Sequence, residues 1–151
     1  MVTGYSHKQP APFCLVLYGA ALASFIFAGL ARGTPGVYIA SGVGLLIALL
    51  ASAFHHLAVD DRGEVLRIAF GPLHVFQRTV RYREITQVEV GRTLLSDSWG
   101  IHMSRQGGWV WNIWGRDCVV VYLQNGVLRI GTDDAARLAA FLEQKQQAER
   151  T

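Results

Sequence analysis

Two long apolar runs stand apart from the rest of the chain. Residues 13–30 and 37–54 are each 18 residues long and contain no charged side chain. At 1.5 Å per residue each run would form a helix of about 27 Å, close to the roughly 30 Å hydrocarbon core of a bilayer. A helix is the expected form because lipid offers no partners for free backbone N–H and C=O groups. The pattern therefore predicts two transmembrane helices.

The linker between these runs, residues 31–36, is short and contains two glycines and a proline. It predicts that the two helices form an antiparallel hairpin over residues 13–54. One alternative is a cleaved signal peptide, which the second apolar run disfavours. Another is a helical hairpin buried in a soluble core, although the 97 residues that follow are few to cover two such apolar helices.

Small residues recur every four positions in both runs, and such stripes let helices approach closely in lipid, where no hydrophobic effect drives association. They are Ala20, Ser24 and Ala28 in the first run and Ala40, Gly44, Ala48 and Ser52 in the second. The stripes predict helix packing, either of the two helices on each other or of one helix on another protein.

After residue 54 the pattern changes to short runs with strand-like alternation, separated by glycine, proline and asparagine. The strongest turn signal is Asn125-Gly126, a dipeptide typical of β-hairpins. We expect about seven or eight short antiparallel strands, over residues 56–59, 65–70, 75–82, 85–90, 100–104, 109–113, 118–123 and 127–130.

The last element predicted is a helix over about residues 133–147. Thr132 is a suitable N-cap, followed by acidic residues in the first turn, where negative charge is favoured. Leu138, Phe141 and Leu142 form an apolar stripe at helical spacing. Residues 55–151 are thus expected to form a mainly β open barrel or sandwich with a C-terminal helix, preceded by residues 1–12 as an N-terminal segment.

Charge is distributed as unevenly as hydrophobicity. All 11 acidic side chains and 12 of the 14 basic ones follow residue 54, so that part is nearly neutral and offers no basic surface for nucleic acid. Lys8 precedes the first run, Arg62 and Arg67 follow the second, and the linker holds only Arg32. The excess of basic residues at the outer ends places both termini and the β domain in the cytoplasm.

The search for catalytic chemistry finds no motif. The chain has two lysines, no glycine-rich phosphate loop and no nucleophile elbow. Cys14 lies in an apolar run and Cys118 in an expected strand, so the two do not pair with each other. The sequence therefore predicts a protein that is not an enzyme and needs no cofactor.

Four histidines are candidate metal ligands: His55, His56, His74 and His102. Adjacent residues of a strand point to opposite faces, which makes one ion bound by both His55 and His56 awkward. The simpler interpretation is a pair of amphipathic side chains at the membrane interface, and we expect no metal site.

Four tryptophans fall within 16 residues: Trp99, Trp109, Trp111 and Trp114. Alternation places Trp109, Trp111 and Ile113 on one strand face, with Val110, Asn112 and Trp114 on the other. In so small a domain we expect one face to be core and the other to be half covered. The alternative is an aromatic patch against the lipid interface or a partner protein.

Five arginines lie in neighbouring expected strands: Arg67, Arg78, Arg81, Arg83 and Arg92. They could form a solvated face balanced by Glu84 and Glu89. They could instead contact anionic lipid headgroups, at about 1 kcal/mol per basic residue near the surface.

Residues 55–145 resemble the bacterial pleckstrin-homology-like (PH-like) domain proteins. The resemblance rests on residues 66–71, on residues 82–85 leading to Val88, on residues 99–101 and on residues 128–134 before the helix. It implies an open barrel capped by the C-terminal helix, used for binding or assembly, and a location in the bacterial inner membrane. The first hairpin, residues 60–64, is acidic, which argues against the phosphoinositide binding of eukaryotic members.

These patterns lead to two functional hypotheses. The first is a non-catalytic, two-pass membrane protein that acts as an accessory subunit or assembly factor of a larger membrane protein complex; photosynthetic, secretory and envelope systems all remain open. The second is a module that binds anionic lipid through the arginine face. Other integral membrane proteins and the bilayer are the expected partners, nucleic acid is not, and a homo-oligomer is left open.

Overall fold

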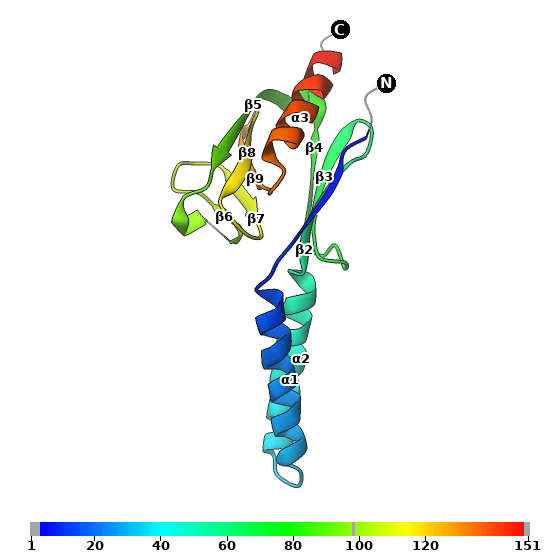
Figure 1. The fold of residues 1–151 in the computed structure, drawn as a ribbon, viewed down its shortest axis with the longest axis vertical. Helices are drawn as coiled ribbons and strands as arrows, with labels where there is room; N and C mark the ends of the chain where they lie inside the picture. Colours follow the sequence, from blue (N-terminus) through cyan, green and yellow to red (C-terminus); the bar gives the residue numbers. More distant parts are fainter. Residues whose placement is uncertain (1–3, 98, 150–151) are drawn as a thin grey trace.

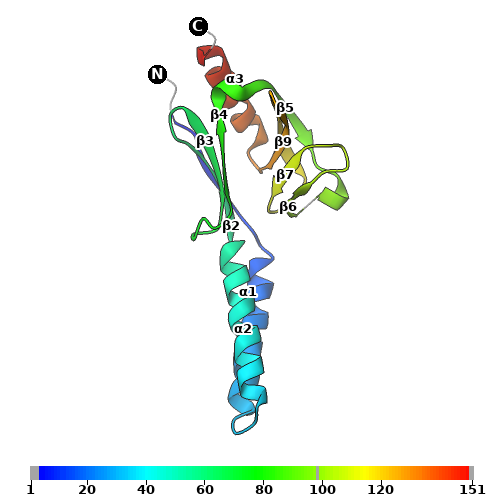
Figure 2. The ribbon, with the colours of Figure 1, turned by 180° about the vertical axis from the view of Figure 1, so that it is seen from behind.

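The computed structural model describes residues 4–97 and 99–149, which form a helical hairpin and a β-rich part that we call the β head. Helices α1 (Cys14–Leu30) and α2 (Gly36–Ala53) lie side by side and antiparallel. They project from the β head as a stalk, as Figure 1 and the reverse view in Figure 2 show.

The β head is built from two sheets and one helix. Sheet A has the order β1-β2-β3-β4, and sheet B has the order β5-β8-β9-β7-β6. The strands of sheet A are β1 (Ser6–Pro10), β2 (His56–Asp61), β3 (Val65–Phe70) and β4 (Gln77–Arg81). Those of sheet B are β5 (Ile85–Arg92), β6 (Gly100–Met103), β7 (Trp109–Asn112), β8 (Asp117–Leu123) and β9 (Gly126–Gly131). The short turns η1 (Tyr82–Glu84) and η2 (Leu95–Asp97) and the C-terminal helix α3 (Ala135–Glu149) complete the head.

The prediction of a mainly β part with a C-terminal helix is confirmed, and each of the eight expected segments overlaps one strand, with ends that differ by at most two residues. The expectation that all of them are antiparallel is wrong, because β7 pairs in parallel with β9. In sheet B, β9 lies between its hairpin partner β8 and the strand β7. Sequence patterns reveal strands but not this order.

Within the expected N-terminal segment, residues 6–10 form the edge strand β1, which the sequence pattern did not predict. Strand β1 pairs with β2 from Ser6 opposite Asp60 to Pro10 opposite His56. The Ala11 N–H continues this ladder by donating to the His55 carbonyl at 3.0 Å. The helical hairpin therefore occupies the position of the turn between two paired strands, and both of its ends are held by the same sheet.

One described helix, α2, is long and apolar enough to cross a membrane by length and composition. Helix α1 is equally apolar but one residue shorter, with 17 residues. Large apolar side chains point outward along both helices, among them Leu22, Ile26, Leu46 and Leu49. The stalk thus exposes the side chains that a water-soluble protein would cover.

The core of the β head lies between the two sheets and α3. Alternate residues of sheet A, including Leu57, Leu66 and Ile68, face the inward residues Leu128 and Ile130 of sheet B. Leu138 and Leu142 of α3 close one end of this core. With Thr132 as the N-cap, the helix would begin at residue 133, but α3 begins two residues later, at Ala135. The Asp134 carbonyl accepts the Leu138 N–H at 3.1 Å, and the Thr132 hydroxyl instead accepts the Asp134 N–H.

Contrary to expectation, both faces of β7 are buried from Val110 onward, while Trp109 at its start is exposed. Trp111 and Ile113 lie in the core between the sheets, whereas Val110 and Asn112 are fully buried on the opposite face. The segment around η2 covers that face, because Asp97 lies against His102 and Ser104 of the neighbouring β6 segment. The loop that contains η2 therefore covers this face of sheet B, as a third layer of structure would.

Candidate interaction surfaces

The junction between the stalk and the β head is tightly built. The Cys14 thiol donates to the Phe54 carbonyl at 3.0 Å, which joins the first residue of α1 to the end of α2. Gly71, just after β3, donates its N–H to the His56 carbonyl at 2.8 Å. Gly71 has a φ of +60°, and a Cβ there would lie 2.5 Å from the Ser52 carbonyl oxygen and closer still to that of Ala53. The end of β3 therefore packs directly on the last turn of α2.

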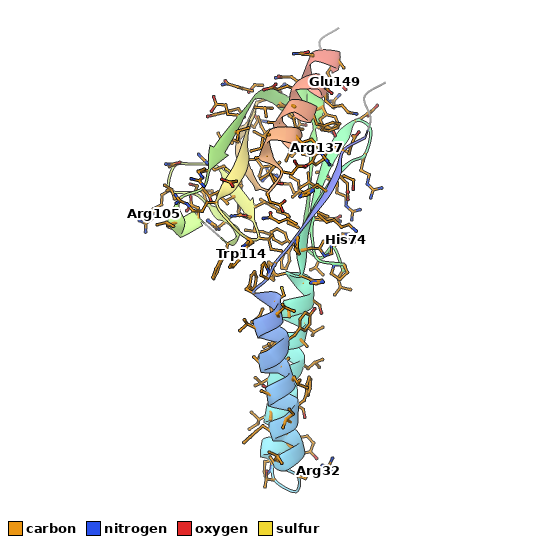
Figure 3. The ribbon with its side chains drawn as sticks, in the orientation of Figure 1. Arg32, His74, Arg105, Trp114, Arg137 and Glu149 are labelled. Atoms are coloured by element: carbon orange, nitrogen blue, oxygen red, sulfur yellow. The ribbon has the colours of Figure 1, made fainter. Side chains whose placement is uncertain are left out.

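An aromatic stack lies beside the start of α1. The ring of Phe13, the residue before the helix, is stacked on Trp99 at 5.7 Å and on Trp114 at 6.3 Å between centroids. The two indole rings are themselves stacked at 5.8 Å. Trp99 is 59% exposed and Trp114 is 39% exposed, so the stack presents its outer faces to the surroundings. Figure 3 shows Trp114 at the base of the β head, next to the upper end of the stalk.

A second apolar group lies beside the end of α2, on the other side of the stalk. Phe54, the residue after the helix, is stacked on Phe76 of the β3–β4 loop at 5.5 Å. The same loop exposes Leu73 and Val75, and its His74 is labelled in Figure 3 across the stalk from Trp114. We call the two groups, together with Leu95, which lines a hollow with Trp99 and Trp114, the collar. It comprises Phe13, Phe54, Leu73, Val75, Phe76, Leu95, Trp99 and Trp114, and Val75 and Phe76 form its boundary with the groove described next.

A groove opens between the edge of sheet A and the end of sheet B that carries β6 and β7. It has a volume of about 330 Å³ and is lined by Val75, Phe76, Gln77, Arg78, Ile101, Trp109 and Trp111. Trp109 is 42% exposed, and its cross-strand neighbour Met103 extends the apolar surface along β6. Arg78 supplies a positive charge at the wall of this mostly apolar groove, whose other polar side chain is the amide of Gln77.

The four tryptophans therefore do not form one patch. Trp99 and Trp114 belong to the collar, Trp109 lines the groove, and Trp111 packs in the core against Phe70 at 5.6 Å.

The five candidate arginines are not brought onto one face. Arg67 and Arg81 lie on the outer face of sheet A, while Arg78 lies on its inner face, opposite Ile68 and beside the groove. Arg83 belongs to η1. Arg92 lies at the end of β5 and forms an ion pair with Asp117 at 2.9 Å.

The helix contact uses part of the predicted stripes. A Cβ at Gly44 would lie 3.2 Å from the Cβ of Ser24 and 3.1 Å from the Phe25 ring, so Gly44 marks the closest approach of the two helices. Ala28 and Ala40 are buried in the same contact, and Ala48 and Ser52 are half buried. Ala20 points outward and Ala21 is buried in its place. A spacing of four residues drifts around a helix with 3.6 residues per turn, whereas Cys14, Ala21 and Ala28 follow the contact at a spacing of seven.

No group of three His, Cys, Asp or Glu side chains within the described residues could hold a metal ion. His55 and His56 lie with their rings 5.7 Å apart at the base of the β head. Burial and the neighbouring charges of His55, Lys8 and His74 lower the pKa of His56. His102 is remote from these three and lies 3.6 Å from Asp97.

A buried polar network that sequence patterns did not reveal joins α3 to sheet A. Asp61 accepts a hydrogen bond from the Tyr82 hydroxyl at 2.7 Å and pairs with the Lys145 ammonium at 3.1 Å. Burial alone would raise the pKa of Asp61, but the hydrogen bonds from Tyr82, Lys145 and the Gly63 N–H outweigh it and lower that pKa. The network therefore holds α3 against sheet A.

Other residues of these surfaces were also missed, notably Phe13, Phe54 and Phe76. Phe13 and Phe54 begin and end the two predicted spans, and aromatic residues at span ends are a recognised interfacial signal. Phe76 carries no such signal, because its place beside Phe54 depends on how β3 returns to α2.

Compared with protein-family models and with curated proteins, the chain matches none.

The described surfaces thus offer apolar contact, aromatic stacking and one charged groove wall.

Proposed function

We propose that this protein is a non-catalytic membrane protein whose β head is a PH-like interaction module, acting as an accessory subunit or assembly factor of a larger membrane protein complex. Both helices of the stalk cross the inner membrane, and the β head and both termini lie in the cytoplasm. The identity of the partner complex is left open.

The observation that carries this proposal is the insertion of the stalk between two paired strands. Because β1 runs into α1 and β2 runs out of α2, the stalk and the β head cannot swing independently. A module held in this way meets its partners at one height above the membrane and in one orientation. Such a restriction raises the effective concentration for partners in the same membrane, so even a weak contact becomes specific.

The groove is the surface that we assign to the partner. An exposed tryptophan beside an exposed methionine is a combination enriched at protein interfaces. The groove lies beside the edge strand β6, whose outer backbone groups are free of a strand partner within the described residues. A partner segment that is apolar and carries an acidic group or a free carboxylate would fit the groove wall formed by Arg78.

The alternative, an anionic-lipid module that uses an arginine face, has less support. Such a module needs several basic side chains on one surface, and Arg67 and Arg81 share a sheet face that the other three candidates do not. Arg92 is in addition neutralised by Asp117.

The test is to extract the full-length protein from its native membranes in mild detergent and to measure the size of the assembly on native gels. Wild-type protein should migrate in a defined large complex. Trp109→Ala combined with Met103→Glu should release it to the size of the free chain. The matched control is Val90→Glu, since Val90 is also an exposed apolar residue of sheet B but lies on β5, at the opposite edge.

A wild-type chain that migrates alone would contradict the proposal of an accessory subunit. Retention of the complex by the groove variant would remove the groove while leaving the subunit role intact. Binding to anionic vesicles that is abolished by high salt and by charge reversal of Arg78, Arg81 and Arg83 would favour the lipid alternative.

A further inference from the structure

We infer that the collar is a bilayer-binding surface, which inserts its exposed aromatic and aliphatic side chains into the interfacial layer of the leaflet that surrounds the base of the stalk. This inference rests on the proposed membrane insertion of the stalk. It goes further by assigning the lipid interface, rather than water or a protein, as the occupant of the collar.

The first argument is continuity with the stalk. Phe13 immediately precedes α1 and Phe54 immediately follows α2, and each ring is stacked on an exposed loop aromatic. The two helix ends lie at the same level, because the Cys14 thiol donates to the Phe54 carbonyl. The collar therefore continues the apolar surface of the stalk outward on two opposite sides at one level.

The second argument is length. At 1.5 Å per residue, the 17 residues of α1 and 18 of α2 span about 26 and 27 Å, less than the roughly 30 Å of a hydrocarbon core. A stalk that is slightly short draws the structure at its base toward the membrane. The collar is the part of the β head that lies there, and the exposed Arg32 marks the opposite end of the stalk (Figure 3).

The third argument is chemistry. Tryptophan favours the headgroup layer because its ring is apolar and its N–H is polar, and Trp99 and Trp114 are both partly exposed, at 59% and 39%. Leu95, Trp99 and Trp114 line a shallow hollow of about 610 Å³ together with Arg116. Arg116 is exposed, and its Nε donates to the Thr93 carbonyl at 3.4 Å, so its guanidinium is held at the surface where a lipid phosphate would meet it. Asp97 is buried and accepts hydrogen bonds from Ser96 and Ser104.

The two sides of the collar would also fix the orientation of the β head relative to the membrane plane. A single apolar loop would let the head tilt, whereas groups on both sides of the stalk resist tilting in either direction. The groove then opens sideways at a short distance above the bilayer, where only a membrane-associated partner would reach it.

The experiment uses the full-length protein in phosphatidylcholine vesicles that contain lipids brominated near the carbonyl end of the acyl chains. Bromine quenches tryptophan fluorescence only on close approach. Wild-type protein should show quenched, blue-shifted emission that does not change in high salt. In the double variant Trp99→Phe and Trp114→Phe, the brominated lipid should quench the remaining tryptophan fluorescence much less than in wild type. Trp109→Phe is the matched control, because Trp109 has nearly the same exposure as Trp114 (42% against 39%) but lies in the groove.

A second variant keeps the test valid if the double replacement does not fold. Leu95→Glu changes a residue that is almost entirely on the surface, and it should reduce the quenching of Trp99 and Trp114 without changing thermal unfolding in detergent. Met103→Glu, which alters an exposed residue on β6, should leave the quenching as in wild type.

The outcomes separate the collar from the stalk. If the protein resists carbonate extraction but Trp99 and Trp114 are quenched only by aqueous acrylamide, the collar lies in water and this inference is overturned while the membrane insertion stands. If carbonate extracts the protein, the proposed membrane insertion itself fails. If the two tryptophans are shielded from acrylamide in native membranes yet unquenched in pure lipid vesicles, a protein covers the collar and the lipid assignment is wrong.

Discussion

The stalk and the β head bury opposite kinds of side chain. In the stalk the helix contact is made by small residues such as Ala21, Gly44 and Ala51, while leucines and isoleucines point outward. In the head the order is reversed, with Leu128 and Leu142 fully buried and charged side chains on the surface. The same amino acid, leucine, is therefore 58% exposed at Leu46 and 0% exposed at Leu128.

The difference shows which force stabilises each part. The β head gains its stability from apolar area removed from water, at about 25 cal/mol per Å². The stalk, once in lipid, gains nothing from covering leucine and depends on close backbone approach and van der Waals contact. The collar lies at the boundary between these two parts. The following predictions test whether the head depends on apolar burial and the stalk on close helix contact.

The largest effect is expected from truncating the core of the head. Leu128→Ala should cost about 4 kcal/mol of unfolding free energy, because a fully buried leucine leaves a cavity when it is shortened. The control, Leu46→Ala on the stalk, should cost less than about 0.5 kcal/mol, as is usual for surface replacements. Denaturant unfolding in detergent micelles measures both. Equal losses would contradict the proposed division.

The junction should be nearly as sensitive. Gly71→Ala combines positive-φ strain with a Cβ that collides with the backbone carbonyls of Ser52 and Ala53, and should cost about 3 kcal/mol. Gly63→Ala is the matched control, since Gly63 has a φ of +84° but open space around it. It should cost only about 1 kcal/mol, the strain alone. Thermal unfolding of the full chain distinguishes the two, and similar shifts would show that the junction is loose.

The Asp61 network should make the head sensitive to acid. The pKa of Asp61 is lowered in the folded protein, so its contribution to stability is complete above the unfolded value of about 3.9 and is lost as the pH falls through the folded value. Asp61→Asn should cost about 2 kcal/mol at pH 7, because the Lys145 ammonium loses its charged partner. The difference between variant and wild type should shrink below about pH 4. An undiminished difference at pH 3, followed by thermal unfolding, would refute this role.

The smallest effect concerns the helix contact. Gly44→Leu should cost about 1–2 kcal/mol, because Ser24 and Phe25 leave little room for a side chain. Gly42→Leu adds the same side chain where nothing lies within 4 Å and should be nearly neutral. Helix separation in micelles, measured by energy transfer between labels on the two helices, should increase only for the first. Equal behaviour of the two variants would mean that the contact carries no specificity.

The sequence by itself determined the kind and position of most elements. The uncharged runs up to residue 54 located both helices to within a few residues, since a long apolar segment has few other stable forms. Alternation and turn residues located eight strands and the C-terminal helix, because these signals are local. The pairing of β1 was missed, since Ser6–Pro10 is a short polar edge strand whose partner lies about 50 residues away.

Only the tertiary structure decided which of these elements meet. It joined Phe13 to Trp99 and Trp114, Phe54 to Phe76, and Asp61 to Lys145, pairs separated by 22 or more positions in the chain. It also separated Trp109 from Trp114 and distributed the five arginines over several surfaces. Local patterns depend on a residue and its near neighbours, whereas a surface depends on sheet order and on the covering of faces by loops, which arise only when the whole chain packs.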